Sequence, residues 1–227
     1  MDFSNQTVVV TGGTGALGIA VVNTLLDAGA RCVVPYINDA EAKALAQHER
    51  LQLVRCDLSD EAQVAALYSG ITDLSASIHI AGGFAFAPIA ESDKEVLMRM
   101  VNMNLVSTYL CCREAVRAFG ERQGRIVNVA SRQALEPRAG KYMTAYTASK
   151  AAVAALTQAL AAEVAPRILV SAVAPSIIDT PANRTAMPDA DYTQWPKPAE
   201  IASGIVFLAS GANQLASGAI VPIYGAA

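Results

Sequence analysis

Short apolar runs alternate with longer helical patterns along the whole chain. The runs are rich in Val, Ile and Leu and lack polar alternation, which predicts strands that are covered on both faces of a sheet. The sequence places such runs at 7–11, 31–36, 51–56, 74–82, 125–131, 168–175 and 218–225. The segments between them predict longer helices at 16–29, 59–70, 93–120, 145–164 and 198–210.

Strands and helices that alternate at this spacing favour one architecture. Parallel strands need long crossover connections, usually helices, so the pattern predicts an α/β fold. The expected core is a Rossmann-type doubly wound parallel sheet of about seven strands with helices on both faces. No repeat, low-complexity linker or change in composition divides the chain, so we expect one domain over residues 1–227. Pro35 weakens the second strand, because proline has no N–H to donate to a sheet ladder.

The segment 176–197, SIIDTPANRTAMPDADYTQWPK, shows no clear element. A stretch of about 20 residues without an element inside a compact domain is usually functional or disordered. It contains Tyr192 and the single tryptophan of the chain, Trp195. We interpret it as a lid over a substrate site. The alternative is a solvated surface segment whose aromatic rings pack back against the core.

Composition and charge narrow the classes of partner. Hydrophobic residues make up 53% of the chain and charged residues 16%, which is typical of a folded globular protein. The net charge of −3 gives no electrostatic surface for nucleic acid. No apolar run approaches the roughly 20 residues of a membrane span, and the first residues lack a signal-peptide pattern. We therefore expect a cytoplasmic protein that acts on a small molecule and binds neither nucleic acid nor a membrane.

The cysteines and histidines predict no metal site. No two cysteines form a Cys-x-x-Cys pair, and neither His48 nor His79 lies near an obvious ligand cluster. All four cysteines lie in apolar or helical contexts, so we interpret them as reduced thiols of the core: Cys32, Cys56, Cys111 and Cys112.

A glycine-rich loop separates the first strand from the first helix. Gly13, Gly15 and Gly18 fit the pattern Gly-x-Gly-x-x-Gly, in which the glycines allow a tight turn, close approach to a pyrophosphate and close packing of helix on strand. The N-terminus of the following helix then faces the anion with free amides. The alternative is a glycine-rich turn without a ligand. On the first interpretation the dinucleotide-binding loop comprises Thr11, Gly12, Gly13, Thr14, Gly15, Ala16 and Leu17.

The end of the second strand bears on the choice between NAD and NADP. A dinucleotide fold usually has an acidic residue there, which binds the adenosine ribose hydroxyls. This chain has Tyr36 instead, followed by Ile37 and Asn38. No acid repels a 2′-phosphate, but no basic residue attracts one either, since Arg31 lies at the other end of the strand. The sequence leans slightly towards NADP.

The stretch YTASK, residues 146–150, puts a phenol and an ammonium four residues apart in an alanine-rich helical pattern. Residues at this spacing share a helix face, so Tyr146 and Lys150 can act on one site. A nearby positive charge lowers the pKa of an acid by about 1–3 units. Lys150, together with an oxidised nicotinamide, would bring Tyr146 from its ordinary value near 10 into the range of a general acid/base. The alternative is that Tyr146 packs and Lys150 is solvated.

Seven motifs in order now resemble one family. TGGTGALG and YTASK are joined by CDLSD (56–60), IAGG (80–83), NMNLVSTY (102–109), GRIVNVAS (124–131) and APSIIDTP (174–181). Over nearly its full length the chain resembles the single-domain branch of the short-chain dehydrogenases/reductases. The resemblance implies an NAD(P)-dependent oxidoreductase that transfers a hydride between nicotinamide and a carbonyl or alcohol. Ala16, Ser176 and the pair 79–80 differ from the family's usual glycines and asparagines, but none of these changes removes a proton-transfer group.

The resemblance also implies a role for each matching residue. Tyr146 would exchange the proton, Ser131 would hold the substrate oxygen, and Lys150 would tune Tyr146 and bind the nicotinamide ribose. Asn104 would hold a water that links Lys150 to solvent. Further cofactor contacts would come from Tyr36, Asp57, Leu58, Ala81, Gly82, Gly83, Pro175, Ile178 and Thr180, and substrate contacts from Phe84, Tyr192 and Trp195.

Each residue also has a plain structural interpretation. Ser131 could be an ordinary strand-end hydroxyl, Asn104 a helix residue that bonds a carbonyl, and Asp57 a helix cap. Thr180 could simply begin the turn before Pro181. Their common position at the ends of predicted strands, where open α/β sheets bind ligands, favours the functional interpretation.

The sequence leaves two alternative functions open and also predicts an oligomeric state. The segment IDTPANRTAMPDADYTQW resembles the dihydropteridine reductases of this family, so a quinonoid dihydropteridine-type reductase is the first alternative. That group usually lacks the serine found here as Ser131. A catalytically silent dinucleotide-binding sensor is the second alternative. The family resemblance further implies a homodimer or homotetramer built through the long helices near 93–120 and 142–165.

Overall fold

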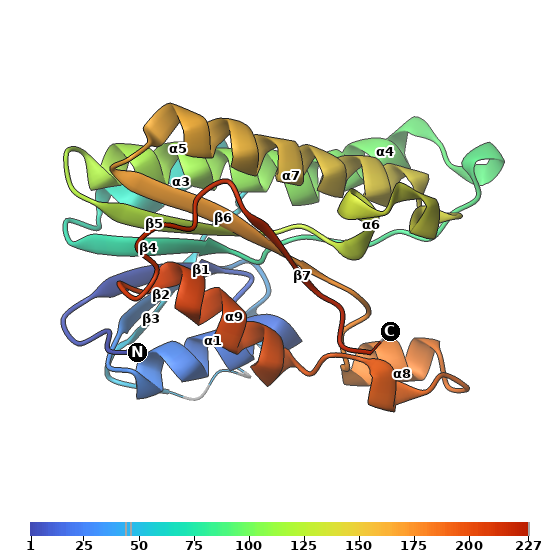
Figure 1. The fold of residues 1–227 in the computed structure, drawn as a ribbon, viewed down its shortest axis with the longest axis horizontal. Coiled ribbons are helices and arrows are strands. Elements are labelled where there is room, and N and C mark those ends of the chain that lie inside the picture. The colour runs from blue at the N-terminus through green and yellow to red at the C-terminus, as the bar shows by residue number, and fades with distance from the viewer. Residues whose placement is uncertain (44, 46, 227) are drawn as a thin grey trace.

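Seven parallel strands form the centre of the protein. A computed structural model describes residues 1–43, 45 and 47–226, and its sheet has the order β3-β2-β1-β4-β5-β6-β7 (Figure 1). The strands are β1 Thr7–Thr11, β2 Arg31–Tyr36, β3 Leu51–Arg55, β4 Leu74–His79, β5 Gly124–Val129, β6 Ile168–Pro175 and β7 Ile220–Ile223. The predicted doubly wound parallel sheet is therefore confirmed.

Helices cover both faces of this sheet. In Figure 1, α3, α5 and α7 lie above it, and α1 and α9 lie below it. These five are α1 Ala16–Asp27, α3 Glu61–Ser69, α5 Ser107–Phe119, α7 Thr144–Val164 and α9 Pro198–Ala209. Shorter helices are α2 Asp39–Ala42, α4 Lys94–Met100, α6 Arg132–Leu135 and α8 Pro181–Ala186, with single turns at Ile89–Glu91, Pro137–Gly140 and Tyr192–Gln194.

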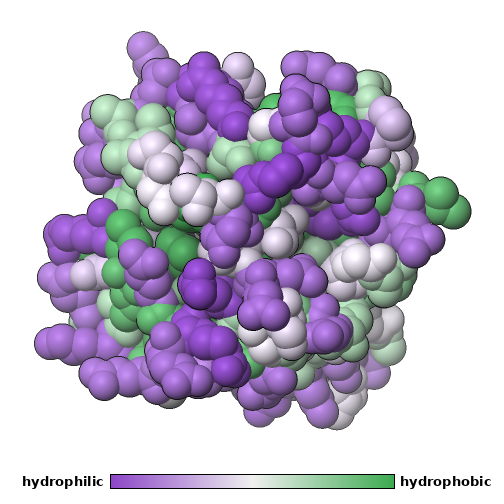
Figure 2. Space-filling view, turned by 90° about the vertical axis from the view of Figure 1, so that its left-hand side faces the viewer, coloured by the Kyte–Doolittle hydropathy of each residue, from purple (hydrophilic) through white to green (hydrophobic). Residues whose placement is uncertain are grey.

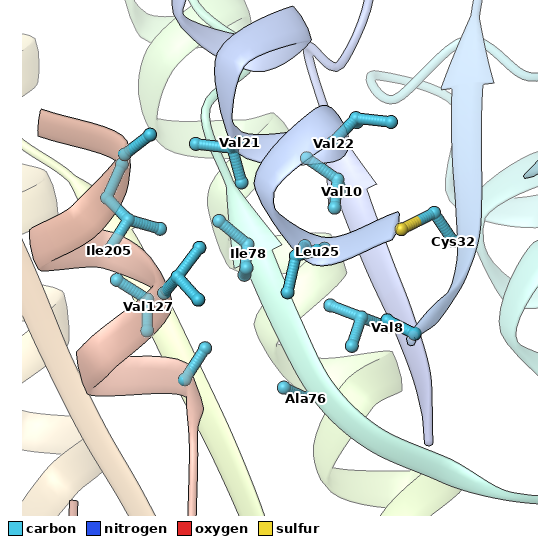
Figure 3. Packing of buried hydrophobic residues seen from close by; sticks show 14 of the residues in the cluster. Val8, Val10, Val21, Val22, Leu25, Cys32, Ala76, Ile78, Val127 and Ile205 are labelled. Carbon is cyan, nitrogen blue, oxygen red and sulfur yellow. The ribbon is translucent and has the colours of Figure 1, made fainter. Parts of the chain in front are cut away.

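The core divides into two layers because successive side chains of a strand point to opposite faces. On β1, Val8 and Val10 pack with α1 and α9, whereas Val9 packs on the other side with α3 and α5. Figure 3 shows the first layer, in which Leu25 of α1 and Ile205 of α9 lie over the sheet. Each such side chain that is fully buried stabilises the fold by about 1.5–3 kcal/mol.

Several predicted boundaries differ in the structure. The helix predicted over 93–120 is divided into α4, a π-helical segment, Val101–Val106, and α5. The helix predicted over 59–70 begins at Glu61, where Asp60 caps α3 and its carboxylate accepts hydrogen bonds from the Ala62 and Gln63 amides. The last strand is shorter than 218–225. The segment 176–197 is not irregular throughout, since α8 and a 3₁₀ turn lie within it.

The strand order reverses between β1 and β4. The chain leaves β1 towards β2 on one side of the sheet and leaves β4 towards β5 on the other side. In open parallel sheets a ligand binds outside the carboxyl ends of the strands at such a point. In Figure 1 this is the right-hand end, where α6, α8 and the chain's C-terminus also lie.

The opposite end of the molecule is formed by the loops that precede the strands. Figure 2 shows this face, which is largely hydrophilic with small separate apolar areas. An open cavity of about 380 Å³ lies there between the loops that lead into β5, β6 and β7, away from the carboxyl ends. Among the residues that the structure describes, none of the helices has the length and apolarity needed to cross a membrane.

Candidate active site

The loop after β1 is packed so closely that two of its glycines are sterically required. Gly12 has φ +66°, and a Cβ there would lie 2.6 Å from the Ala81 amide nitrogen. A Cβ on Gly18, in the first turn of α1, would overlap the carbonyl oxygen of Gly12. The loop and the helix therefore approach each other closely at Gly18, the last glycine of the Gly-x-Gly-x-x-Gly pattern, and at Gly12, which lies outside that pattern.

Gly15, by contrast, is not needed for packing. A Cβ on it would meet only the Gly12 carbonyl oxygen, at 3.5 Å, and its φ of −83° suits any residue. Gly15 is the N-cap of α1, and it makes no side-chain cap, so the first amides of the helix lack a capping side chain. Such a helix end binds anions well. The loop Thr11–Leu17 therefore fits the pyrophosphate of a dinucleotide.

Thr11 joins this loop to the turn after β4. It is buried, and its hydroxyl accepts a hydrogen bond from the Ala81 amide at 3.2 Å, while its carbonyl accepts one from the Ile80 amide at 3.2 Å. The two turns that flank the reversal of strand order are thus held together. Ala81, Gly82 and Gly83, which the sequence predicts beneath a ribose, lie in the segment that follows β4.

Asn104 fixes this second turn from below. Its side chain is fully buried in the π-helical segment, accepts a hydrogen bond from the Gly83 amide at 2.8 Å and donates one to the Gly83 carbonyl at 3.1 Å. It also donates to Ser149 of α7 at 2.9 Å. π-helical segments occur often at functional sites, and this one sets Asn104 between two elements. Sequence reasoning missed Ser149, although it lies three residues after Tyr146.

Ser131, Tyr146 and Lys150 meet at the carboxyl end of β5. The Lys150 ammonium is buried and donates to the Val129 carbonyl at 2.8 Å. A Cβ on Gly82 would lie 3.4 Å from this ammonium, so the turn after β4 closes over it. Ser131 is 3% exposed. Among the described residues, its hydroxyl has no hydrogen-bond partner. A buried hydroxyl without a partner is unfavourable unless a ligand supplies one.

Burial has the largest influence on the pKa values of Tyr146 and Lys150. It raises the pKa of the Tyr146 phenol above its ordinary 10.0, and the nearby Ser131 hydroxyl opposes this in part although the pair lacks ideal hydrogen-bond geometry. Burial also lowers the pKa of Lys150 to about 8, so the ammonium stays charged at neutral pH. The sequence predicts that Lys150 lowers the pKa of Tyr146. In the structure its ammonium bonds a backbone carbonyl, and the lowering influence comes from Ser131.

The residues expected near the adenosine lie together at the ends of β2 and β3. The Tyr36 carbonyl accepts a hydrogen bond from the Cys56 amide at 2.9 Å, which brings Asp57 and Leu58 beside the end of β2. The Asp57 carboxylate accepts from the amide and the hydroxyl of Ser59 at 2.9 and 2.7 Å. Asp57 therefore stabilises a turn before α3 rather than capping the helix.

The segment expected around the nicotinamide begins at the end of β6. Pro175 is buried, and Ile178 packs against the core layer that contains α1 and α9. Thr180 caps α8, since its hydroxyl oxygen accepts a hydrogen bond from the Asn183 amide at 3.2 Å. The hydroxyl proton of Thr180 is not used in that bond and can serve a ligand.

The three aromatic residues expected at the substrate fall into two groups. The Phe84 ring is exposed and meets the Tyr146 ring edge-on, with centroids 5.1 Å apart. Tyr192 and Trp195 pack on each other at 5.0 Å, and Trp195 is buried. The Tyr192 hydroxyl lies 2.9 Å from the Pro188 carbonyl oxygen. The geometry favours substrate contact for Phe84 and internal packing of the segment 176–197 for the other two.

Comparison with known proteins decides the family. A family model described as short chain dehydrogenase matches residues 6–191, which is most of the chain. The chain belongs to the short-chain dehydrogenase/reductase family. The chain is 36% identical to galactitol 2-dehydrogenase of Rhizobium johnstonii, over 95% of this chain and 92% of that protein.

Solved structures agree with this assignment. One is the short-chain dehydrogenase/reductase described as glucose/ribitol dehydrogenase from Brucella melitensis, with 29% identity, a TM-score of 0.88, and coverage of 99% and 98% of the two chains. Another is ElxO with NADP bound, with 25% identity, a TM-score of 0.89 and coverage of 97% of each chain. The protein is thus an enzyme of a family that uses nicotinamide dinucleotides.

The dehydrogenase also contains a buried polar network that sequence reasoning missed. His79, at the end of β4, lies 2.8 Å from the Ser77 hydroxyl through Nε2 and 2.8 Å from the Asn128 side-chain oxygen through Nδ1. Asn128 donates to Thr157 of α7 at 2.9 Å. Burial lowers the pKa of His79 from 6.5 to about 4, so its ring is neutral at pH 7. The network links β4, β5 and α7 beneath the candidate site.

Acidification is expected to lower the free energy of unfolding of the protein through protonation of His79. Its pKa is about 4 when folded and 6.5 when unfolded, so its contribution is complete above pH 6.5 and is lost as the pH falls towards 4. Between pH 7.5 and 5 this amounts to about 2 kcal/mol in the free energy of unfolding. Urea unfolding at both pH values measures it. The variant His79→Gln, which cannot titrate, should show a pH dependence smaller by that amount, and an unchanged dependence would contradict the assignment.

Proposed function

We propose that this dehydrogenase transfers a hydride between a nicotinamide dinucleotide and the carbon of a carbonyl or secondary alcohol, with Tyr146 as general acid/base. The observation that carries the proposal is the buried Ser131 hydroxyl, which lacks a partner and lies beside the Tyr146 phenol and the charged Lys150. A substrate oxygen placed there would receive hydrogen bonds from both hydroxyls. Among the described residues, no group of the chain satisfies the Ser131 hydroxyl.

Each side chain has one step in the proposed reaction. In the reducing direction Tyr146 gives its proton to the carbonyl oxygen as the carbon accepts the hydride, and in the oxidising direction it removes that proton. Ser131 holds the oxygen in place and stabilises its developing negative charge. Lys150 stabilises the tyrosinate that remains, because its ammonium is charged below about pH 8. Asn104 positions the turn at Gly82–Gly83 and, we propose, also the water that returns a proton to the site.

The chain supplies a place for the dinucleotide, which in turn supplies the hydride and, when oxidised, a positive ring. The uncapped N-terminus of α1 and the loop 11–17 would hold the pyrophosphate. The turn 81–83 would lie under a ribose, and Thr180 would bond the carboxamide. In the chain alone burial raises the pKa of Tyr146, and an oxidised nicotinamide held beside it would oppose this with its positive charge.

The segment 176–197 is proposed to close over the substrate as a lid. It follows directly from β6 at the carboxyl edge of the sheet, and its α8, Tyr192 and Trp195 give it packing of its own. A bidentate ion pair between Arg184 and Asp179, at 2.6 and 2.8 Å, ties α8 to its base. A segment that is packed internally can move as one body, which suits a lid. Phe84 would form the wall on the opposite side.

A substrate panel tests the proposed function. The purified protein is mixed with each reduced dinucleotide and with ketoses, cyclic ketones and a quinonoid dihydropteridine, and absorbance at the nicotinamide band is followed. Ketoses are included because the relatives named above are dehydrogenases of a polyol and of glucose or ribitol by their descriptions. Turnover of a ketone supports the proposal, and turnover of the pteridine alone supports the dihydropteridine-type alternative. Tight dinucleotide binding without turnover of any compound would instead indicate a silent sensor.

The dehydrogenase is expected to assemble as a homodimer or homotetramer. Leu97 and Met98 of α4 are each 42% exposed, and Tyr109 of α5 is 51% exposed, so the outer side of these helices presents apolar surface. Sedimentation equilibrium should give two or four times the chain mass of 23.7 kDa. The double variant Leu97→Glu with Met98→Glu should reduce the mass to one chain. Leu215→Glu, at a residue that is 91% exposed elsewhere, should not, and a wild type that is purely monomeric would contradict the expectation.

A further inference from the structure

Glu41 places a carboxylate at the dinucleotide-binding loop. It lies in α2, the short helix that follows β2, and it is exposed. The Thr14 hydroxyl of the loop donates to one Glu41 carboxylate oxygen at 3.3 Å, and the side-chain amide of Asn38 donates to the other at 3.2 Å. The carboxylate therefore spans the gap between the loop after β1 and the residues at the end of β2.

That gap is where the two kinds of nicotinamide dinucleotide differ. In this topology the pyrophosphate lies on the loop after the first strand, and the adenosine ribose lies at the end of the second strand. A group that touches both places is within reach of the ribose 2′ position. NAD carries a hydroxyl there, which donates well to a carboxylate, and NADP carries a phosphate, which a carboxylate repels.

The neighbouring charges do not offset Glu41. Arg55, at the end of β3, forms an ion pair with Asp39 of α2 at 2.9 Å. Asp39, Glu41, Lys43 and Arg55 together carry no net charge, but Arg55 is engaged by Asp39, and among the described residues Glu41 takes part in no ion pair. A phosphate with a charge near −2 would thus meet a carboxylate that no cation pairs among the described residues.

We propose that Glu41 is a specificity-determining residue that selects NAD(H) over NADP(H). Its carboxylate accepts a hydrogen bond from the ribose 2′-hydroxyl and repels a 2′-phosphate. The end of β2 lacks an acid, which is why the sequence leans towards NADP, but the fold supplies the acid five residues after Tyr36, from a helix. This inference rests on the proposed function, because it concerns the cofactor of the same site.

Direct binding tests the role of Glu41 without relying on turnover. The dissociation constants of NADH and NADPH are measured by nicotinamide fluorescence for the wild type and for Glu41→Gln. We expect the wild type to bind NADH at least about tenfold more tightly, and Glu41→Gln to reduce that ratio by about tenfold or more, chiefly through tighter NADPH binding. One tenfold change corresponds to about 1.4 kcal/mol.

Glu49→Gln is the matched control. It removes the same charge from an exposed carboxylate that pairs with Arg50 just before β3, at the other end of that strand. Its NADH-to-NADPH ratio should equal that of the wild type. A shift as large as that of Glu41→Gln would mean that only net charge matters and would overturn the inference.

The remaining outcomes separate this inference from the proposed function. A wild type that binds NADPH as tightly as NADH, or a Glu41→Gln variant with an unchanged ratio, overturns the role of Glu41 and leaves the proposed function standing. A wild type that binds neither dinucleotide, with intact folding by circular dichroism, overturns the proposed function and this inference with it.

Discussion

Replacement of Tyr146 by phenylalanine is expected to lower turnover by about 10²- to 10⁴-fold, the usual contribution of a general acid/base. The change removes one oxygen atom and keeps the ring. The edge-on packing against Phe84 is retained, and the bond from Ser149 is retained because it goes to the Tyr146 carbonyl, not to its hydroxyl. Steady-state turnover on the best substrate of the panel measures the loss.

Dinucleotide binding is the control for this variant. The loop 11–17 and the turn 81–83 do not involve the Tyr146 hydroxyl, so the dissociation constant of the preferred reduced dinucleotide should stay within about twofold of the wild type. If Tyr146→Phe kept more than about a tenth of the turnover, the proton would have to come from elsewhere, and the proposed mechanism would be wrong. A parallel loss of binding would show instead that the ring or its position had changed.

Gly18→Ala is expected to abolish dinucleotide binding and to destabilise the fold. The added methyl would overlap the Gly12 carbonyl oxygen and lie 2.6 Å from the Gly13 Cα, and both are backbone atoms that cannot rotate away. Overpacking of this kind costs about 1–3 kcal/mol and occasionally more, and the displaced loop would no longer fit a pyrophosphate. Urea unfolding and nicotinamide fluorescence measure the two effects.

Gly15→Ala is the matched change in the same loop. Its methyl would meet only the Gly12 carbonyl oxygen at 3.5 Å, an ordinary contact, and its backbone suits alanine. We expect its free energy of unfolding to lie within about 1 kcal/mol of the wild type, since alanine is a slightly poorer N-cap than glycine. Equal damage from both substitutions would mean that the loop tolerates no side chain at all, contrary to the packing described.

The fold was predictable because its signals are local. Buried parallel strands and long helices repeat along the chain with their own composition, so the order of elements follows from reading it once. The strand pairing explains how β2 accommodates Pro35. The pairing of β2 with β1 ends at Val33, so Pro35 lies where β2 pairs with β3 alone.

The site was predictable where motifs fix a residue on an element, and not where contacts join distant segments. Tyr146 and Lys150 share a helix face by spacing alone. The clamp of Asn104 on Gly83, the pair of His79 with Asn128 and the contact of Thr14 with Glu41 join segments 21, 49 and 27 residues apart, and no local pattern encodes them.

The prediction that Lys150 and an oxidised nicotinamide together lower the pKa of Tyr146 concerns the cofactor-bound state, and in the chain alone burial raises that pKa. Spacing shows that a lysine is near, but the pKa also depends on how deeply the phenol is buried and on what the lysine bonds. Likewise Tyr192 and Trp195 looked equally suited to substrate contact and to packing, and only their mutual contact favours packing.

The burial of Lys150 affects which substitutions selection would favour during evolution. A pKa lowered from 10.5 to about 8 means that the charged side chain weakens the folded state by about 3 kcal/mol at neutral pH. An uncharged side chain of similar size would remove this cost, at the loss of the hydrogen bond to the Val129 carbonyl, and by the proposed mechanism the protein would be inactive. Selection for robustness alone therefore favours loss of this lysine, and only continued demand for the reaction preserves it.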